Sequence, residues 1–195
     1  MNLGAHPQAE QGFLQGKLLI AMPGMPDPRF ERSVILMCSH SAQGALGLIV
    51  NKPIPGLPFR ELMNKMDIGV TAATPGNPVL FGGPVDTGSG YILHAKEHVS
   101  RASTVAITPE IALTGTMDVI RAIAAGRGPE RWLMALGYAG WGPGQIENEI
   151  AGNGWIHCDA DPGIVFDAAM EAKWRLAFGK LGAGLSGLSS EAGRA

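Results

Sequence analysis

A cysteine and a histidine two residues apart, Cys38 and His40, offer the most reactive chemistry in this chain of 195 residues. Side chains two apart on a strand share a face, so the thiol and the imidazole could meet there. Such a pair supports a thiolate nucleophile or half of a metal site. The alternative is a buried structural cysteine at the end of an apolar strand, with the histidine in the following loop. Cys38 and His40 are therefore the candidates for catalysis, with both interpretations open.

A metal site would need ligands from elsewhere in the chain, namely from His157-Cys158 and from His94 or His98. Adjacent residues on a strand point to opposite faces, so His157 and Cys158 do not form a pair. Neither a CxxC nor an HExxH spacing is present to support metal binding. We expect no metal and no cofactor.

Two polar segments offer a binding site for a ligand. Residues 26–32 form a loop rich in proline and charge, and residues 51–53 (Asn-Lys-Pro) end a buried strand. The alternative is a structural clasp, in which a carboxylate accepts backbone N–H bonds and each arginine pairs with an acid. A glycine turn follows the strand at 78–81, and all three segments could converge on one cleft. The candidate ligand-binding residues are Asp27, Arg29, Arg32, Asn51, Lys52, Gly82 and Gly83.

Glycine-rich turns provide two places where backbone N–H groups could surround an anion. The first, at Gly82 and Gly83, is better explained as a tight connection between paired strands. The second, at residues 140–144, precedes a predicted helix, and helix N-termini attract anions. Glu147 and Glu149 on that helix oppose anion binding. No P-loop and no dinucleotide-binding fingerprint is present.

Composition narrows the class of protein. Hydrophobic residues make up 46% and charged residues 16%, which is typical of a globular domain. The 15 basic and 17 acidic residues give a formal net charge of −2, which makes direct DNA binding an unfavoured function. No apolar run approaches the roughly 20 residues of a membrane span, and no signal-peptide pattern begins the chain. The chain has only two cysteines, and we interpret both as reduced thiols. We therefore expect a cytoplasmic protein.

Apolar periodicity predicts the elements. Short apolar runs indicate strands, with a turn expected at 44–47 and a hairpin expected between 78–81 and 90–94. Apolar residues at helical spacing predict helices over 58–66, over 145–151, over 167–181 and from Thr116 to Gly126. The predicted strands are residues 17–22, 33–39, 48–50, 78–81, 90–94, 104–107, 111–113, 131–138, 154–158 and 163–166.

These elements predict one compact domain of the α+β class over residues 16–181. Hairpin-like pairs dominate over steady β–α alternation, which favours a mixed, largely antiparallel sheet or half-open barrel, sandwich-like and flanked by about four helices. Residues 1–15 are expected to form a flexible N-terminus. Residues 182–195, which are rich in glycine and serine, are expected to form a disordered tail.

Several motifs in order carry a resemblance to a known family. They are LLIAMPGMPDPRFERSVILMCSH, GALGLIVNKP, FGGPV with GYILH, and ALGYAGWGPGQIENEI followed by NGW, and they extend from residue 18 to about residue 174. The chain resembles the bacterial AlgH/YqgE family, which is uncharacterised and sometimes labelled a transcriptional regulator. The resemblance implies a compact domain with a sheet flanked by helices, and no catalytic residues or cofactor. Family members often have an acidic residue where this chain has Ser39.

Three hypotheses of function remain. The first is a non-enzymatic cytoplasmic protein that regulates by binding a protein or small-molecule partner, with a homodimer as the default oligomer. The second is a module that binds a small molecule or anion through the polar loops and glycine turns. The third is a thiol enzyme or redox sensor that uses Cys38 and His40. The sequence favours a binding protein over an enzyme.

Overall fold

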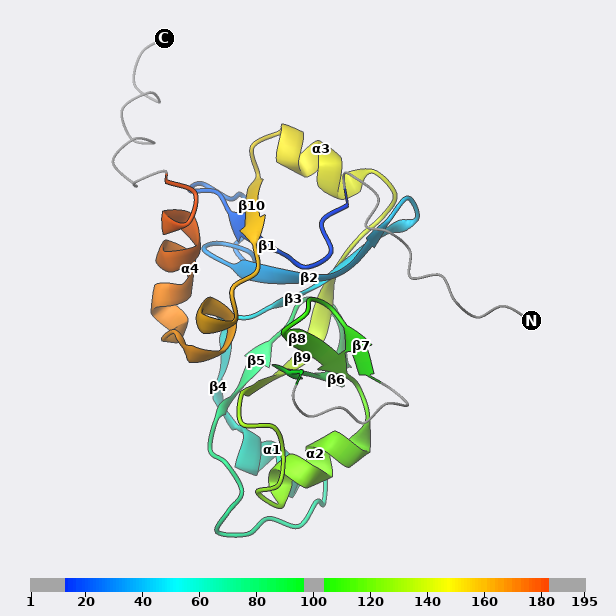
Figure 1. Ribbon diagram of the computed structural model, residues 1–195, viewed down its shortest axis with the longest axis vertical. Coiled ribbons are helices and arrows are strands. Elements are labelled where there is room, and N and C mark those ends of the chain that lie inside the picture. The colour runs from blue at the N-terminus through cyan, green and yellow to red at the C-terminus, as the bar shows by residue number, and fades with distance from the viewer. Residues whose placement is uncertain (1–12, 97–103, 183–195) are drawn as a thin grey trace, which may run out of the picture.

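The computed structural model describes residues 13–96 and 104–182. Most of the two segments expected to be flexible, 1–15 and 182–195, lie outside the described residues, and so does His98. Within the described ranges, ten strands form a single sheet that curls into a half-barrel (Figure 1). The strands are β1 (Lys17–Ala21), β2 (Val34–Ser41), β3 (Gly44–Ile49), β4 (Pro53–Pro58), β5 (Pro78–Phe81), β6 (Val85–Ala95), β7 (Thr104–Ala106), β8 (Ile111–Thr114), β9 (Trp132–Trp141) and β10 (Trp155–Asp159).

The sheet has the order β10-β1-β2-β3-β9-β6-β8-β7, and β4 joins it through β5, which pairs with β9. Every described pairing is antiparallel except the parallel one between β5 and β9. In residues 13–96 and 104–182, four α-helices and one π-helix accompany the strands, which confirms the prediction of an α+β half-open barrel. The helices are α1 (Phe59–Lys65), α2 (Met117–Ala124), α3 (Gln145–Ala151), the π-helix η1 (Gly163–Asp167) and α4 (Met170–Gly179).

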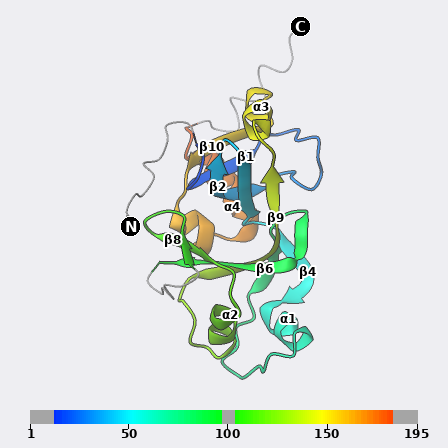
Figure 2. The ribbon, with the colours of Figure 1, turned by 90° about the vertical axis from the view of Figure 1, so that its right-hand side faces the viewer.

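The long strand β9 joins the two halves of the sheet. Its last residues pair with β3, whereas its first residues pair with β5 on one side and β6 on the other. Gly137 lies between these two parts with φ 70, a conformation that glycine adopts without strain. The chain bends there, and β6 consequently runs across the direction of β1 and β2 (Figure 2).

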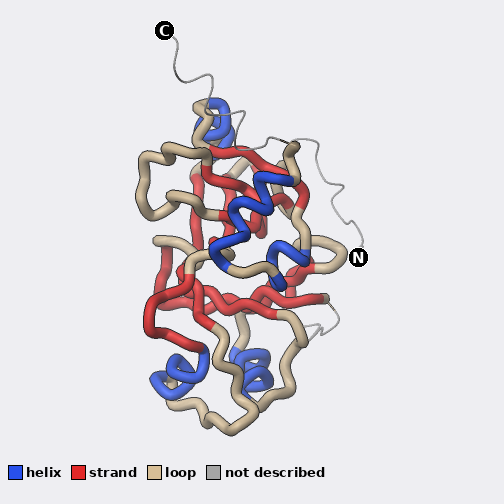
Figure 3. The backbone as a smooth tube through the Cα atoms, turned by 90° about the vertical axis from the view of Figure 1, so that its left-hand side faces the viewer, coloured by secondary structure: helices blue, strands red, loops and turns tan. Residues whose placement is uncertain are grey.

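Helices cover both sides of the curled sheet. The π-helix and α4 lie over β1, β2 and β3, α3 lies at one end of the molecule, and α1 and α2 lie together at the other end (Figures 1 and 3). Side chains alternate between the two faces of the sheet along a strand, so neighbouring residues of β2 pack into different cores. Leu36 packs into the core that includes Phe178 of α4, and Ile35 packs into the core that includes Ile146 of α3. A third core lies between α1, α2 and the strands β5, β6 and β9.

The predicted hairpin between residues 78–81 and 90–94 is wrong. Strand β9 lies between β5 and β6, so these two strands do not pair with each other. The turn that joins them must pass close to β9, and the N–H of Gly82 donates to the carbonyl of Leu136 at 2.8 Å. A Cβ at Gly83 would overlap the backbone of Tyr138 and Ala139. The glycine turn therefore exists because the chain crosses β9 at contact distance.

The predicted strand at 163–166 is also wrong, because these residues form the π-helix η1. The side chain of Asp161 accepts the N–H groups of Gly163 and Ile164, at 2.9 and 3.4 Å, and so begins the helical turn. The Ala168 N–H donates to the carbonyl of Gly163, five residues earlier. A run as short as Ile-Val-Phe does not distinguish strand from helix by periodicity.

Further bounds differ from the predictions: β6 begins at Val85, β9 extends to Trp141, and β4 was not predicted. The expected turn at 44–47 belongs to strand β3, and the chain instead turns at Ala42 and Gln43. Position 47 within that strand is occupied by glycine because a Cβ there would lie only 2.5 Å from the Ile35 side chain. The last helix, expected over 167–181, is shorter and extends from Met170 to Gly179.

In the described part of the chain, no helix has the length and apolar character needed to cross a membrane.

Candidate functional site

The structure places Cys38 and His40 on opposite faces of the sheet. Strand β2 has a bulge between Met37 and Ser39, so the alternation of side chains is shifted by one residue at Cys38. The Cys38 side chain packs in the core beneath α4 and is 4% exposed. Burial raises the pKa of its thiol to about 12, which removes thiolate at neutral pH. The two side chains are therefore not a nucleophile and its base.

The imidazole of His40 instead connects three segments on the other face. The N–H of Leu14 donates to its Nδ1 at 3.0 Å, so Nε2 carries the proton and donates to Glu147 at 2.9 Å. The Phe13 ring packs against the imidazole edge-on, with centroids 5.0 Å apart. His40 thus joins the start of the described chain, β2 and α3. Its contacts are structural.

Asp27 and Arg29 bind each other rather than facing a shared cleft. The Arg29 guanidinium donates to both carboxylate oxygens, with Nη2 2.7 Å from Oδ2, and its backbone N–H also donates to Asp27. The hydrogen bonds from Arg29 hold the pKa of the Asp27 carboxyl below its usual value. This pair forms the structural clasp that the sequence offered as an alternative.

The glycine turn uses its polar groups within the sheet. Besides the bond from Gly82 to β9, the carbonyl of Gly82 accepts the N–H of Ile49 at 2.9 Å. Both Gly82 and Gly83 are buried. At the second glycine cluster, the N–H of Gly142 donates to the Gln145 side chain at 3.0 Å. These groups are bonded within the chain and are not directed at a ligand.

The side chain of Asn51 fastens the two polar segments together. Its Nδ2 donates to the carbonyl of Arg32 at 2.8 Å, and its Oδ1 accepts the N–H of Val34 at 2.8 Å. Lys52 adds a second link, because its Nζ donates to the carbonyl of Arg29 at 2.9 Å. The loop at 27–32 and the strand end at 51–52 therefore form one surface.

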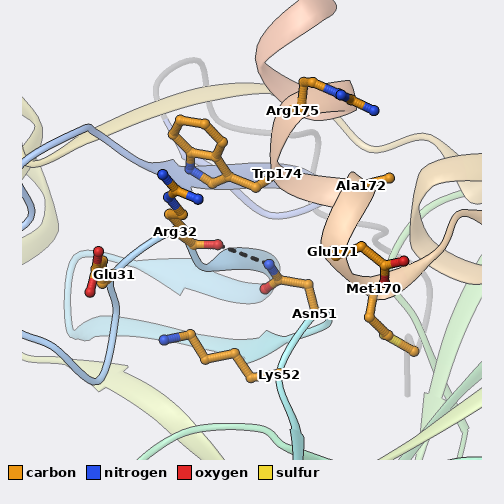
Figure 4. A pocket seen from close by; sticks show the side chains of 9 residues that line it. All are labelled: Glu31, Arg32, Asn51, Lys52, Met170, Glu171, Ala172, Trp174 and Arg175. Carbon is orange, nitrogen blue, oxygen red and sulfur yellow. Dashed lines mark hydrogen bonds between the residues drawn. The ribbon is translucent and has the colours of Figure 1, made fainter.

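That surface is one wall of a cleft of about 620 Å³, and helix α4 is the other wall (Figure 4). We refer to it as the Asn51–Trp174 cleft. It includes three of the predicted ligand-binding residues, and Asp27, Arg29, Gly82 and Gly83 are not among the residues that line it. The lining residues are Glu31, Arg32, Asn51, Lys52, Met170, Glu171, Ala172, Trp174 and Arg175.

Arg32 is an exposed cation of the cleft, with one contact to its backbone and another to its guanidinium. Its backbone has φ 52, which is uncommon for a residue other than glycine and marks local strain. The bond from Asn51 to its carbonyl stabilises this conformation. The guanidinium lies 5.7 Å from the centroid of the Trp174 ring, and that ring is itself fixed by an indole N–H bond of 2.8 Å to Ala21. Within residues 13–96 and 104–182, no carboxylate lies within ion-pair distance of Arg32.

The cleft carries both signs of charge. Burial lowers the pKa of Lys52, and attraction to Glu31 and Asp27 acts in the opposite direction. Glu171 and Arg175 add one charge of each sign from α4, where both side chains are exposed. Among the described residues, no group of three or more histidine, cysteine, aspartate or glutamate side chains could hold a metal ion. The chemistry available in the cleft is hydrogen bonding and charge pairing with a ligand.

The wall contributed by α4 was missed from the sequence. The indole of Trp174 is half-buried, packs against the core and also lines the cleft. The sequence did contain a signal of a polar surface there: Glu171 and Arg175 are four residues, or one helical turn, apart, and Trp174 lies between them.

Comparison with known proteins identifies the family. The model of the family described as AlgH-like (DUF179) matches residues 18–186. The chain belongs to the AlgH-like family. This membership confirms the resemblance seen in the motifs of the sequence.

Relatives match over nearly their whole length. A UPF0301 protein of Jannaschia sp. (strain CCS1) is 54% identical over 183 residues, which cover 93% of this chain and 95% of that protein. Another from Bradyrhizobium diazoefficiens is 48% identical over 199 residues, covering 98% and 93%. These names identify an uncharacterised family and specify no activity.

Solved structures share the fold. The solution structure of the AlgH protein from Pseudomonas aeruginosa is 41% identical, with a TM-score of 0.77, and the match covers 96% of this chain and 99% of that one. The crystal structure of a protein from Corynebacterium diphtheriae is 21% identical, with a TM-score of 0.63 over 77% of this chain and 78% of that one. The second match bears on the fold alone.

Proposed function

We propose that this protein is a non-enzymatic, cytoplasmic binding protein that acts through the Asn51–Trp174 cleft. One observation carries the proposal: the Arg32 guanidinium is positioned at a cleft of small-molecule size without a carboxylate partner in the described residues. Binding pockets for small molecules measure about 300–1,000 Å³. An arginine held in place by its neighbours provides a ready site for an anionic group.

The alternatives are less well supported. A thiol enzyme needs a reactive thiolate, and the Cys38 thiol is buried with its pKa raised to about 12. Direct reading of DNA needs a basic surface, and the chain has a formal net charge of −2. A role in regulation, as the label attached to this family suggests, would follow from ligand binding in the cleft rather than from contact with DNA.

Native mass spectrometry tests the proposal. The protein is incubated with a bacterial extract of molecules below about 1 kDa, which covers ligands that fit such a cleft. We expect a bound mass that is released on denaturation and that is lost from the variant Arg32→Ala. Arg121→Ala serves as the matched control, because Arg121 is exposed on α2, which contributes no residue to the cleft and lies apart from α4 (Figure 1). A wild-type protein without any adduct, or an adduct equally retained by Arg32→Ala, would contradict the proposal.

A further inference from the structure

The charges that line the Asn51–Trp174 cleft restrict the class of ligand. We infer that the ligand is small and dipolar: a single carboxylate or phosphate oxyanion binds Arg32 and Lys52, and an adjacent ammonium or amide donor binds Glu171. This inference rests on the proposed function and specifies its ligand. Among the described residues, the cations and carboxylates that line the cleft form no ion pairs with each other.

The oxyanion half of the site is already assembled. The guanidinium of Arg32 presents a planar set of N–H donors that matches the two oxygens of a carboxylate or phosphate. The Asn51 bond to its carbonyl fixes its backbone, the Trp174 ring lies 5.7 Å from its guanidinium carbon, and neither contact uses a guanidinium N–H. A group that is already in place loses little conformational entropy when the ligand binds. The oxyanion therefore meets a preorganised donor.

Lys52 provides the second donor for the oxyanion. Its ammonium group has three N–H bonds, and the carbonyl of Arg29 is the one acceptor that the structure gives it in the described residues. The side chain lies on the same wall of the cleft as Arg32 (Figure 4). An ammonium that is partly buried gains most from a new anionic partner, because few waters solvate it. Arg32 and Lys52 together suit a single oxyanion.

The carboxylates define the other half of the ligand. Glu31 and Glu171 line the same cleft, and in the described part of the chain neither forms an ion pair with its arginines. In Figure 4 they lie on opposite sides of Asn51, and Glu171 belongs to the α4 wall. Three cations (Arg32, Lys52 and Arg175) against these two carboxylates leave the cleft with one net positive charge, which one oxyanion balances. The carboxylates would repel the further negative charges of a polyanion, whereas they would attract an ammonium on the ligand. The cleft thus selects a dipole over a polyanion.

Titrations followed by ¹⁵N NMR test this ligand class, with the indole N–H of Trp174 as the reporter inside the cleft. The dipolar probes are glycylglycine, which carries a carboxylate, and phosphoethanolamine, which carries a phosphate. The oxyanion probes are acetate and inorganic phosphate, and the polyanion probe is ATP. We expect at least one dipolar probe to shift the resonances of Trp174, Arg32 and Asn51, with a dissociation constant at least tenfold lower than that of its oxyanion alone. The better dipolar probe distinguishes carboxylate from phosphate.

Three variants test separately the contacts of the oxyanion and of the ammonium. Arg32→Lys keeps the charge and removes the planar donor set, so every oxyanion should bind at least tenfold more weakly. Glu171→Gln should weaken binding of the dipolar probes and leave acetate and phosphate binding equal or slightly tighter, because it also removes a carboxylate that repels an oxyanion. Arg121→Ala on α2 should bind as wild type.

Several outcomes would overturn the inference. Tighter binding of ATP or of the simple oxyanions would exclude a dipolar ligand and leave the binding function in place. Absence of shifts with all probes would exclude this ligand class, and the native mass spectrum would then decide separately whether the cleft binds anything. Shifts confined to residues outside the cleft would contradict both the inference and the proposed function.

Discussion

Lys173 provides the sharpest test of the structure, because a lysine is rarely buried completely. Its side chain is 0% exposed beneath the cleft, and its Nζ donates to the carbonyls of Val50 and Val165 at 2.9 and 2.6 Å. Burial lowers the pKa of Lys173 from 10.5 to about 8, and attraction to Asp167 offsets a small part of that effect. The folded protein therefore releases this proton at a lower pH than the unfolded chain does.

The consequence for stability follows from the proton balance. Between about pH 8 and pH 10.5 the unfolded chain keeps the Lys173 proton and the folded protein has lost it. The free energy of unfolding must then rise with pH over this window, because stability increases wherever the unfolded state binds more protons. Below pH 8 both states are protonated and the contribution is constant. Integration between pH 7 and pH 10 gives an increase of about 2–3 kcal/mol from this group.

The variant Lys173→Met isolates this contribution. Methionine leaves two carbonyls without a donor, which costs stability at every pH and does not alter the slope. The difference in unfolding free energy, wild type minus variant, should therefore rise by about 2–3 kcal/mol from pH 7 to pH 10 in urea titrations followed by circular dichroism. Lys65→Met is the matched control, because Lys65 is exposed on α1, and its difference should stay flat. A flat or falling difference for Lys173→Met would refute the burial of a charged lysine.

Three other features of the structure give measurable outcomes. Cys38 should resist alkylation by iodoacetamide until the protein unfolds, and rapid labelling of the native protein would contradict its raised pKa. Gly83→Ala should destabilise by more than about 3 kcal/mol because its Cβ would overlap β9, whereas Gly88→Ala, with open space around it, should cost less than about 1 kcal/mol in the same thermal melts. Glu149 accepts the indole N–H groups of Trp141 and Trp155 at 3.0 and 2.8 Å, so Glu149→Ala should cost about 2–4 kcal/mol and alter tryptophan fluorescence. Unchanged stability in that variant would mean that the indoles do not depend on Glu149.

Local patterns in the sequence were sufficient for most elements and for the fold class. The helix at 145–151 was predicted with the bounds that the structure gives it, because glycines and a proline precede it and apolar residues recur at helical spacing. The prediction of the hairpin failed because the two strands are separated by a distant part of the chain. Residues 78–81 and 90–94 lie close in sequence, and only the insertion of β9, about 40 residues later, separates them. Local periodicity carries no information about such an insertion.

Only one wall of the Asn51–Trp174 cleft could be predicted from the sequence. The structure brings Arg32, Asn51 and Lys52 together through the Asn51 amide, a residue type that often bonds to backbone groups in turns. It also pairs Asp27 with Arg29 at the side of the loop that does not line the cleft. The opposite wall is more than 100 residues away in the sequence, and amphipathic spacing alone places a tryptophan in the core rather than at a surface cleft.

The two walls of the cleft are fastened to each other at the end of strand β3. Three consecutive residues there make the connections: the Val50 carbonyl accepts a bond from Lys173 of α4, the Asn51 amide holds Arg32, and the Lys52 ammonium bonds to the loop at Arg29. Because adjacent residues on one short segment bind both walls, α4 cannot shift without straining the contact that positions Arg32. Substitutions at Lys173 should therefore change ligand affinity as well as stability, although this side chain does not line the cleft. Equal affinity in wild type and Lys173→Met, measured with the ligand found by native mass spectrometry, would show that the two walls act independently.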